Sequence, residues 1–218
     1  VADPTRLASR AVRHQLGHSL KSAACYAISG DHRDRAVRPT RGHLWRLRSE
    51  LAGIGLDPQM TRFFKQEAEV QAAHTLAEGV TLSVSGKLGA IVPLGAEARK
   101  DPKGTCITDR FFLGGVGSLR GFEAHGAGPS DERRPAPKKN TAAAEGASGY
   151  PSISRDAIGG DLLAVGFAEL QLELPFAKLR ELGIYAHVFV NAGTCVPMPT
   201  PGTRAFAASE ASPSGVVA

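Results

Sequence analysis

A glycine-rich run near the middle of the chain, Asp109–Glu123, first suggests a loop that could cradle a phosphate. It reads DRFFLGGVGSLRGFE, and a dinucleotide-binding fingerprint begun at Gly115 and Gly117 would need glycine at position 120, where Arg120 stands. No P-loop sequence occurs, and Ser118 does not lie in the GxSxG turn of hydrolases. The run therefore predicts neither a nucleotide site nor a hydrolase nucleophile.

Other residues that could do chemistry are poorly spaced for it. His14 and His18 lack the intervening glutamate of a zinc-protease motif. Asp31 and Asp34 could form a carboxylate pair for acid-base catalysis, but their arginine neighbours favour ion pairs on the surface of a turn. The cysteines contain no CxxC pair, and they are Cys25, Cys106 and Cys195. We therefore predict no enzyme, no cofactor and no metal site.

The composition suits short strands joined by turns. Hydrophobic residues make up 42% of the 218 residues and aromatic residues 6%, with 25 glycines and 14 prolines. No run of about 18 or more apolar residues occurs, which excludes a membrane-spanning helix, although a strand of a membrane barrel needs only about 10 alternating residues. The net charge of +5 comes from scattered Lys and Arg without interleaved aromatics, which argues against a nucleic-acid partner.

Alternation of apolar and polar residues predicts the strands that must position any site. It is clearest over residues 80–92, 161–176 and 182–193, and weaker over 18–28 and 43–51. In each clear case one face carries Leu, Val, Ala and Gly, which fits a wall that faces lipid somewhat better than the core of a soluble sandwich.

The segment at residues 65–78 is ambiguous, because KQEAEVQAAHTLAE contains strong helix formers and yet alternates. We favour a strand there. Loops are expected at residues 95–108 and 128–155, of which the second is rich in Pro, Ala, Gly and charge and resembles a low-complexity insertion. After Gly193 the alternation ends in a low-complexity tail, residues 194–218.

Several motifs resemble one known family. The run Leu119-Arg120-Gly121-Phe122 resembles the (V/I)RG(F/Y) signature in a long loop of the BamA-like outer-membrane insertases, the bacterial surface antigen family, and the preceding DRFFLGG is similar to the mitochondrial branch. Residues 31–53 resemble the family's RDxxxxPTRG strand and turn through Asp34, Pro39, Thr40, Arg41 and Gly42. Residues 156–176 resemble the strand after the loop, and residues 189–193 resemble its FxDxG wall motif.

The resemblance implies an all-β fold: a fragment of an antiparallel transmembrane β-barrel with a long, inward-folding loop. We expect an upstream segment at residues 1–13, a partial barrel at 14–193 with the insertion at about 128–155, and the tail at 194–218. The chain does not begin with Met, and strands expected on both sides of it are missing, so we expect it to continue in a longer polypeptide.

The resemblance also implies how the signature loop works. Its tip folds back into the barrel, where the fork of donors on Arg120 can engage several acceptors of the wall. Gly121 would allow a tight backbone path, and Phe122 would fill an apolar gap. Leu119 completes the motif.

The expected wall partners lie on two strands. Asn191 replaces the aspartate of FxDxG but keeps a carbonyl acceptor for a guanidinium, and Phe189 and Gly193 complete that motif. Glu169 and Glu173 are second choices, because acidic groups facing the lumen could help to hold the arginine.

The family resemblance implies insertion of β-barrel proteins into the mitochondrial outer membrane through strand pairing at a lateral gate. The implied partners are unfolded β-barrel clients, accessory subunits of an assembly complex and the lipid bilayer. One alternative is a protein-conducting pore of a chloroplast outer envelope or bacterial outer membrane. A second is a soluble β-rich binding domain.

Overall fold

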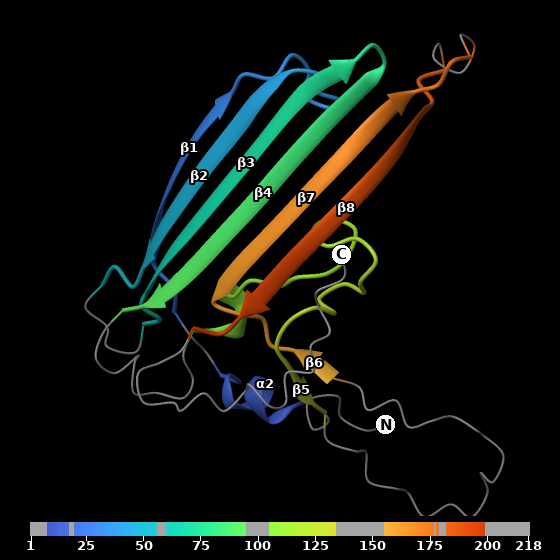
Figure 1. Cartoon of the computed structure of the whole chain (residues 1–218). Helices are drawn as coiled ribbons and strands as arrows, with labels where there is room; N and C mark the ends of the chain where they lie inside the picture. Colours follow the sequence, from blue (N-terminus) through green and yellow to red (C-terminus); the bar gives the residue numbers. More distant parts are fainter. Residues whose placement is uncertain are drawn as a thin grey trace, which may run out of the picture.

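The computed structural model describes residues 8–17, 20–55, 60–94, 105–133, 155–176, 178 and 182–198. Six long strands form one curved antiparallel sheet in the order β1-β2-β3-β4-β7-β8 (Figure 1). Their bounds are β1 Ala23–Asp31, β2 Gly42–Ala52, β3 Phe63–Ala77, β4 Val80–Pro93, β7 Leu162–Glu173 and β8 Tyr185–Val196. Each strand pairs with the next long strand along the chain, as in an up-and-down barrel wall. The prediction of an all-β, antiparallel fold is confirmed.

The ambiguous segment at residues 65–78 lies in β3 up to Ala77, so the alternation outweighed the helix-forming residues. A strand that pairs on both sides gains a full ladder of backbone hydrogen bonds, which local helix propensity cannot offset. Gly79 has a φ of +74° at the turn into β4, a conformation that glycine adopts without strain. No described helix is long and apolar enough to cross a membrane.

The two faces of the sheet differ completely in charge. Residues paired across neighbouring strands share a face, so the registers assign every strand residue to one side or the other. We call the side that carries the signature loop the inner face and the opposite side the outer face. All charged residues of the six strands lie on the inner face, namely Asp31, Arg46, Arg48, Glu50, Lys65, Glu67, Glu69, Lys87, Glu169 and Glu173.

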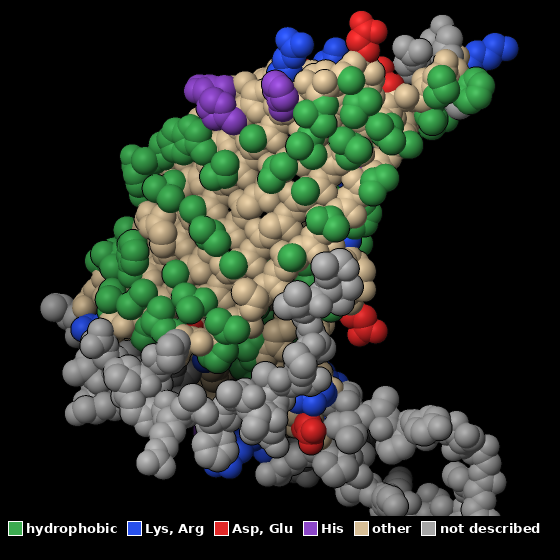
Figure 2. All heavy atoms as spheres, viewed as in Figure 1, with side chains coloured by type: hydrophobic (Ala, Val, Ile, Leu, Met, Phe, Trp, Pro, Cys, Tyr) green, Lys and Arg blue, Asp and Glu red, His purple; other side chains and the backbone are tan. Residues whose placement is uncertain are grey.

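The outer face is apolar and open. Its exposed side chains include Tyr26, Val70, Leu88, Val188 and Val190, which have 54% to 65% of their surface accessible. Figure 2 shows hydrophobic side chains spread over this face, with Lys, Arg, Asp and Glu gathered mainly along its ends. A continuous uncharged band of this kind suits contact with lipid.

Short elements lie at the end of the sheet where β7 begins (Figure 1). They are α2 Arg10–His14, the 3-10 turn η1 Ile107–Asp109, β5 Ser130–Glu132 and β6 Arg155–Ala157. Strands β5 and β6 pair antiparallel with each other and bind α2 through two carboxylates: Asp156 accepts from the Ser9 N–H at 2.8 Å and Asp131 from the Ala11 N–H at 3.1 Å.

The described strands can be set beside the boundaries expected from the sequence. The wall begins at Ala23, so residues 14–22 precede the barrel strands. Strand β8 continues to Val196, because Thr194–Val196 still pair with β7, and the tail therefore starts later than residue 194. The ends of the segment at 128–155 belong to the β5–β6 ladder. Residues 134–154 and 199–218 lie outside the described part of the chain, as do 95–104 of the loop expected at 95–108.

Candidate functional site: the signature loop on the inner wall

The signature loop, defined here as residues 105–128, folds back on itself through short backbone bridges. Leu113 pairs with Ala127 and Gly115 with Leu119, while Phe111 pairs with Gly160 just before β7. At Gly114 φ is +114°, and an added Cβ would lie 2.4 Å from the Glu123 carbonyl oxygen. Glycine is therefore required there for the two arms of the loop to approach each other.

Apolar side chains anchor the loop to one end of the inner face. Phe111, Leu113 and Leu119 are 1% to 6% exposed and form a common core with inward residues of the wall. Those wall residues are Ala52, Phe63, Ile91, Leu163 and Cys195. Burying each large side chain stabilises the docked loop by about 1.5–3 kcal/mol. The inner face is thus polar over most of its length but apolar beneath the loop.

Two wall glycines make room for these anchors. A Cβ added at Gly89 would lie 2.5 Å from Cζ of Phe111, and one added at Gly193 would lie 3.2 Å from Cδ2 of Leu113. Gly193, predicted as part of the wall motif, is therefore brought to the loop because its missing side chain leaves space for Leu113.

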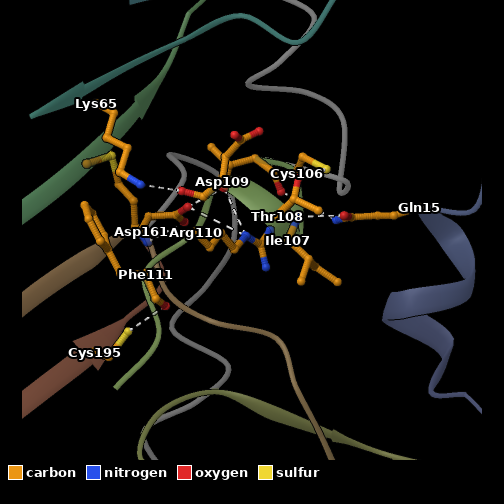
Figure 3. Close-up of polar contacts among 12 residues, drawn as sticks. Gln15, Lys65, Cys106, Ile107, Thr108, Asp109, Arg110, Phe111, Asp161 and Cys195 are labelled. Carbon is orange, nitrogen blue, oxygen red and sulfur yellow. Dashed lines mark hydrogen bonds and ion pairs between the residues drawn. The ribbon is translucent and has the colours of Figure 1, made fainter. Parts of the chain in front are cut away.

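Polar contacts tie the base of the loop to the wall and to the N-terminal segment (Figure 3). The Lys65 ammonium donates to the Asp109 carbonyl at 2.9 Å and lies 4.4 Å from the ring centre of Phe111. The Cys195 thiol donates to the Phe111 carbonyl at 3.3 Å, and the Ile107 N–H donates to the Gln15 side chain at 2.7 Å.

Lys21 adds an ion-pair cluster at the same base, because its ammonium bonds the carboxylates of both Glu50 and Asp109. Burial alone would lower the pKa of Lys21, but hydrogen bonds to the two carboxylates outweigh burial and raise its pKa. Lys21 therefore stays charged at neutral pH and links the loop to β2.

Arg120 points at two aromatic rings of the wall. Its guanidinium carbon lies 4.8 Å from the ring centre of Phe167 on β7 and 4.9 Å from that of Phe189 on β8. The two rings stack 5.7 Å apart with an interplanar angle of 25°, forming one aromatic platform. Phe189 was predicted as a wall partner, whereas Phe167 was missed. The expected carboxylate or amide acceptors are thus replaced by cation–π contacts, which suit a planar guanidinium.

Asn191 does contact the signature motif, but in the opposite sense to the prediction. Its Nδ2 donates to the backbone carbonyl of Arg120 at 3.1 Å, so the amide acts as a donor rather than as an acceptor for the guanidinium. The guanidinium occupies the aromatic platform, which leaves the main-chain carbonyl facing the wall. An aspartate at this position could not make the same bond while ionised.

Gly121 and Phe122 contribute differently from each other. Gly121 has a φ of +92°, and no atom lies within 4 Å of an added Cβ, so its conformation rather than a tight path beside the wall requires glycine. Phe122 packs against the buried core, consistent with the expected filling of an apolar gap.

The two glutamates are not brought to Arg120. Within the described residues no ion pair joins Glu169 or Glu173 to that guanidinium, and the Glu173 carboxylate instead bonds Arg38 at 3.2 Å. Both carboxylates lie on the inner face as predicted. Their expected role as second holders of Arg120 is corrected, since the aromatic rings beside Arg120 occupy that place.

The loop and wall together form an anchored strut. No group of three or more His, Cys, Asp or Glu residues in the described part of the chain is arranged to hold a metal ion. What the geometry can do is fix the loop against β7 and β8, and so hold the inner wall in one shape.

Comparison with known proteins agrees with this architecture. The family model of the Omp85 superfamily domain matches residues 3–212. The mouse "Sorting and assembly machinery component 50 homolog" is 35% identical over 87% of this chain and 34% of its own length. A SAM50-like protein of Schizosaccharomyces pombe is 40% identical over 59% of this chain and 26% of its own length.

A bacterial relative and a solved structure extend the likeness. "Outer membrane protein assembly factor BamA" of Nitratidesulfovibrio vulgaris is 26% identical over 85% of this chain and 20% of its own length. The crystal structure of BamA from Haemophilus ducreyi lacking POTRA domains 1-3 covers 80% of this chain and 30% of the BamA chain, with a TM-score of 0.62 and 21% identity, which supports a shared barrel fold. Our chain spans about a third of the length of the sorting and assembly relatives. It belongs to the Omp85 superfamily and resembles the sorting and assembly machinery component 50 proteins.

Proposed function

We propose that the full-length protein inserts and assembles β-barrel proteins in the mitochondrial outer membrane. The observation that carries this proposal is the docked signature loop: Arg120 lies on the Phe167–Phe189 platform while Asn191 holds its carbonyl. The names of the relatives, "Sorting and assembly machinery component 50 homolog" and "Outer membrane protein assembly factor BamA", support the same activity.

The outer face supports a location in a membrane. It carries no charged strand residue and exposes hydrophobic side chains spread over its whole area (Figure 2). A charge on the lipid side of a barrel at mid-bilayer costs about 2–4 kcal/mol, so a wall this free of charge fits a lipid environment. By the same argument a soluble binding domain is disfavoured, because this surface would remain exposed to water.

The proposed mechanism involves no covalent chemistry. A client protein presents its terminal strand, which pairs through backbone hydrogen bonds with an open edge of the barrel, and successive hairpins follow into the bilayer. An edge can exchange partners only if the rest of the wall keeps its shape. The docked loop supplies that rigidity, since one apolar core joins β7 and β8 to the last residue of β2 and the first of β3.

The partners follow from this mechanism. They are unfolded β-barrel clients, the lipid bilayer and accessory subunits of an assembly complex. The word "component" in the relatives' name supports such a complex.

The proposal is tested with Arg120→Ala in the full-length protein, expressed as the only copy in cells. Assembly of newly imported mitochondrial porin into its mature complex is followed on native gels. We expect porin assembly to fall while the variant remains in the membrane. Arg46→Ala is the matched control, because Arg46 also lies on the inner face but pairs with Glu69, away from the loop.

Normal porin assembly with Arg120→Ala would contradict an insertase that depends on the loop. It would favour the protein-conducting pore instead, in which the same loop would shape a channel. Measuring ion conductance of the same variant then separates the two, because a pore would lose or change its conductance while assembly stayed normal.

A further inference from the structure

The turn between β1 and β2, residues 32–41, reaches across the inner face to the other side of the sheet. Arg38 donates from Nε to Gln171 and from Nη2 to Glu173, each at 3.2 Å, and both acceptors belong to β7. Its guanidinium carbon also lies 4.5 Å from the ring centre of Tyr185 on β8. Strands β3 and β4 lie between β2 and β7, so this one side chain spans the curve of the wall.

The turn that carries Arg38 is locked by its own hydrogen bonds. The Asp34 carboxylate accepts from the Thr40 hydroxyl at 2.6 Å, from the Thr40 N–H at 2.9 Å and from the Arg41 N–H at 3.2 Å. The hydrogen bond from the Thr40 hydroxyl is the largest cause that lowers the pKa of Asp34 below its usual value. Pro39, which is buried, fixes one backbone dihedral within the same loop. These are residues of the motif that resembles RDxxxxPTRG.

Further contacts fasten the turn to β3. Arg33 donates to the Gln71 side chain at 2.8 Å, and the Thr75 hydroxyl donates to the Thr40 carbonyl at 3.0 Å. Gln171, whose side-chain oxygen accepts the hydrogen bond from Arg38, is only 6% exposed. These side chains therefore fasten the turn to the inner wall, unlike a hairpin loop that projects freely into water.

The turn contacts β7 towards the opposite end of the strand from the base of the signature loop. The signature loop packs where β7 begins, beside Leu163, whereas Arg38 bonds Gln171 and Glu173 near the end of β7, about eight to ten residues further on. At roughly 3.3 Å per residue this separates the base of the signature loop from the Arg38 contacts by about 30 Å along the strand. The tip of the loop comes nearer, because Arg120 lies on Phe167, four residues before Gln171. The turn thus holds the inner wall beyond the tip of the signature loop, towards the opposite end of β7.

We propose that the β1–β2 turn is a second internal brace, in which Arg38 fixes the curvature of the wall at this end and narrows the mouth of the lumen. An arginine suits the task because its planar fork can bond two acceptors and stack on an aromatic ring together. The inference concerns the shape of the barrel, so it stands or falls separately from the insertase activity.

The test is single-channel recording of the full-length protein in planar lipid bilayers. Arg38→Ala should increase the fraction of time spent in a larger conductance state by about fivefold, which corresponds to about 1 kcal/mol. Arg35→Ala is the matched control, because Arg35 lies exposed on the same turn, and its records should equal those of the unmodified protein.

A charge exchange distinguishes a brace from a general loss of structure. Arg38→Glu and Glu173→Arg should each increase the fraction of time spent in the larger conductance state. In the double variant this fraction should fall back towards that of the unmodified protein, because the ion pair is re-formed with its charges exchanged. Folding of each variant is checked by its resistance to heat on gels. Folded Arg38→Ala protein with unchanged records, or a double variant no closer to the unmodified protein than the single variants, would overturn the proposal.

A failed brace and a failed insertase give different results. If Arg38→Ala alters conductance while porin assembly stays normal, the brace holds and is separate from insertion. If Arg120→Ala leaves assembly normal while Arg38→Ala alters conductance, only the insertase proposal fails.

Discussion

Replacing Arg120 by alanine removes its aromatic contact while leaving its backbone carbonyl available to Asn191. A cation over an aromatic face contributes about 0.5–1 kcal/mol where exposed and about 2 kcal/mol where water is excluded. Phe189 is 39% exposed, so we take about 1 kcal/mol for each ring. Loss of both contacts should therefore favour the undocked loop by about 2 kcal/mol, or about 30-fold in its equilibrium constant.

Amide hydrogen exchange of the full-length protein in detergent measures this equilibrium. The amides of Gly115, Leu119 and Ala127 are bonded within the signature loop, so they report its opening. In Arg120→Ala we expect them to exchange about 30-fold faster, the ratio that about 2 kcal/mol gives, while the amides of β4 keep their rates. Arg46→Ala should leave all these rates unchanged.

Arg120→Lys refines the same test. A lysine keeps the charge, but its compact ammonium cannot lie flat beside two stacked rings as a guanidinium does, so exchange should fall between the unmodified protein and Arg120→Ala. Unchanged loop exchange in Arg120→Ala would refute the reasoning, because it would mean that the aromatic platform does not hold the loop. Faster exchange of the β4 amides together with those of the loop would refute it too, since it would show that the whole wall had loosened.

Three further predictions follow from the geometry. Asn191→Ala should speed loop exchange by about fivefold, the effect of losing one hydrogen bond of about 1 kcal/mol. Gly89→Ala should lower the free energy of unfolding in urea by about 1–3 kcal/mol because its Cβ would collide with Phe111, whereas Gly86→Ala, with its nearest atom at 3.8 Å, should not. The lowered pKa of Asp34 predicts stability that is present above its usual value of 3.8 and lost as pH falls through the folded value, so Asp34→Asn should reduce the acid dependence of the unfolding midpoint.

The strands and their faces were readable from the sequence because both depend on a local pattern. Over residues 80–92 the alternation gave the correct side for each residue, and β4 runs from Val80 to Pro93. The same holds for residues 65–78, where pairing on both sides overrode helix propensity. Boundaries were less accurate, since strand ends depend on which residues of the neighbour remain available for pairing.

The partners of Arg120 were only partly predictable because they depend on register. Phe167 shares the inner face of its strand with Glu169 and Gln171, and an aromatic ring beside polar residues on that face was a usable sign of a contact. Its place beside Phe189 follows from the pairing of Phe167 with Asn191 and of Glu169 with Phe189, which sets the two rings diagonally across β7 and β8. Local alternation does not specify that register.

The long-range contacts of the β1–β2 turn could not be predicted from the sequence either. Arg38 lies in a motif noted for its resemblance, yet its partners on β7 are 133 and 135 residues away. Only the curvature of the sheet brings them together. The expected contact of Glu173 with Arg120 also depends on position along the strand, because Arg120 lies beside Phe167, whereas Glu173, six residues further along β7, bonds Arg38.

The central claim is that docking of the signature loop on the inner wall is what insertion requires, and one correlation tests it most directly. Loop exchange and the rate of porin assembly would be measured together for Arg120→Ala, Arg120→Lys, Asn191→Ala, Phe167→Leu and the control Arg46→Ala. Our account predicts that assembly slows in the same order as exchange speeds up, with Arg46→Ala unchanged in both. Variants that release the loop and still assemble porin at the normal rate would contradict it.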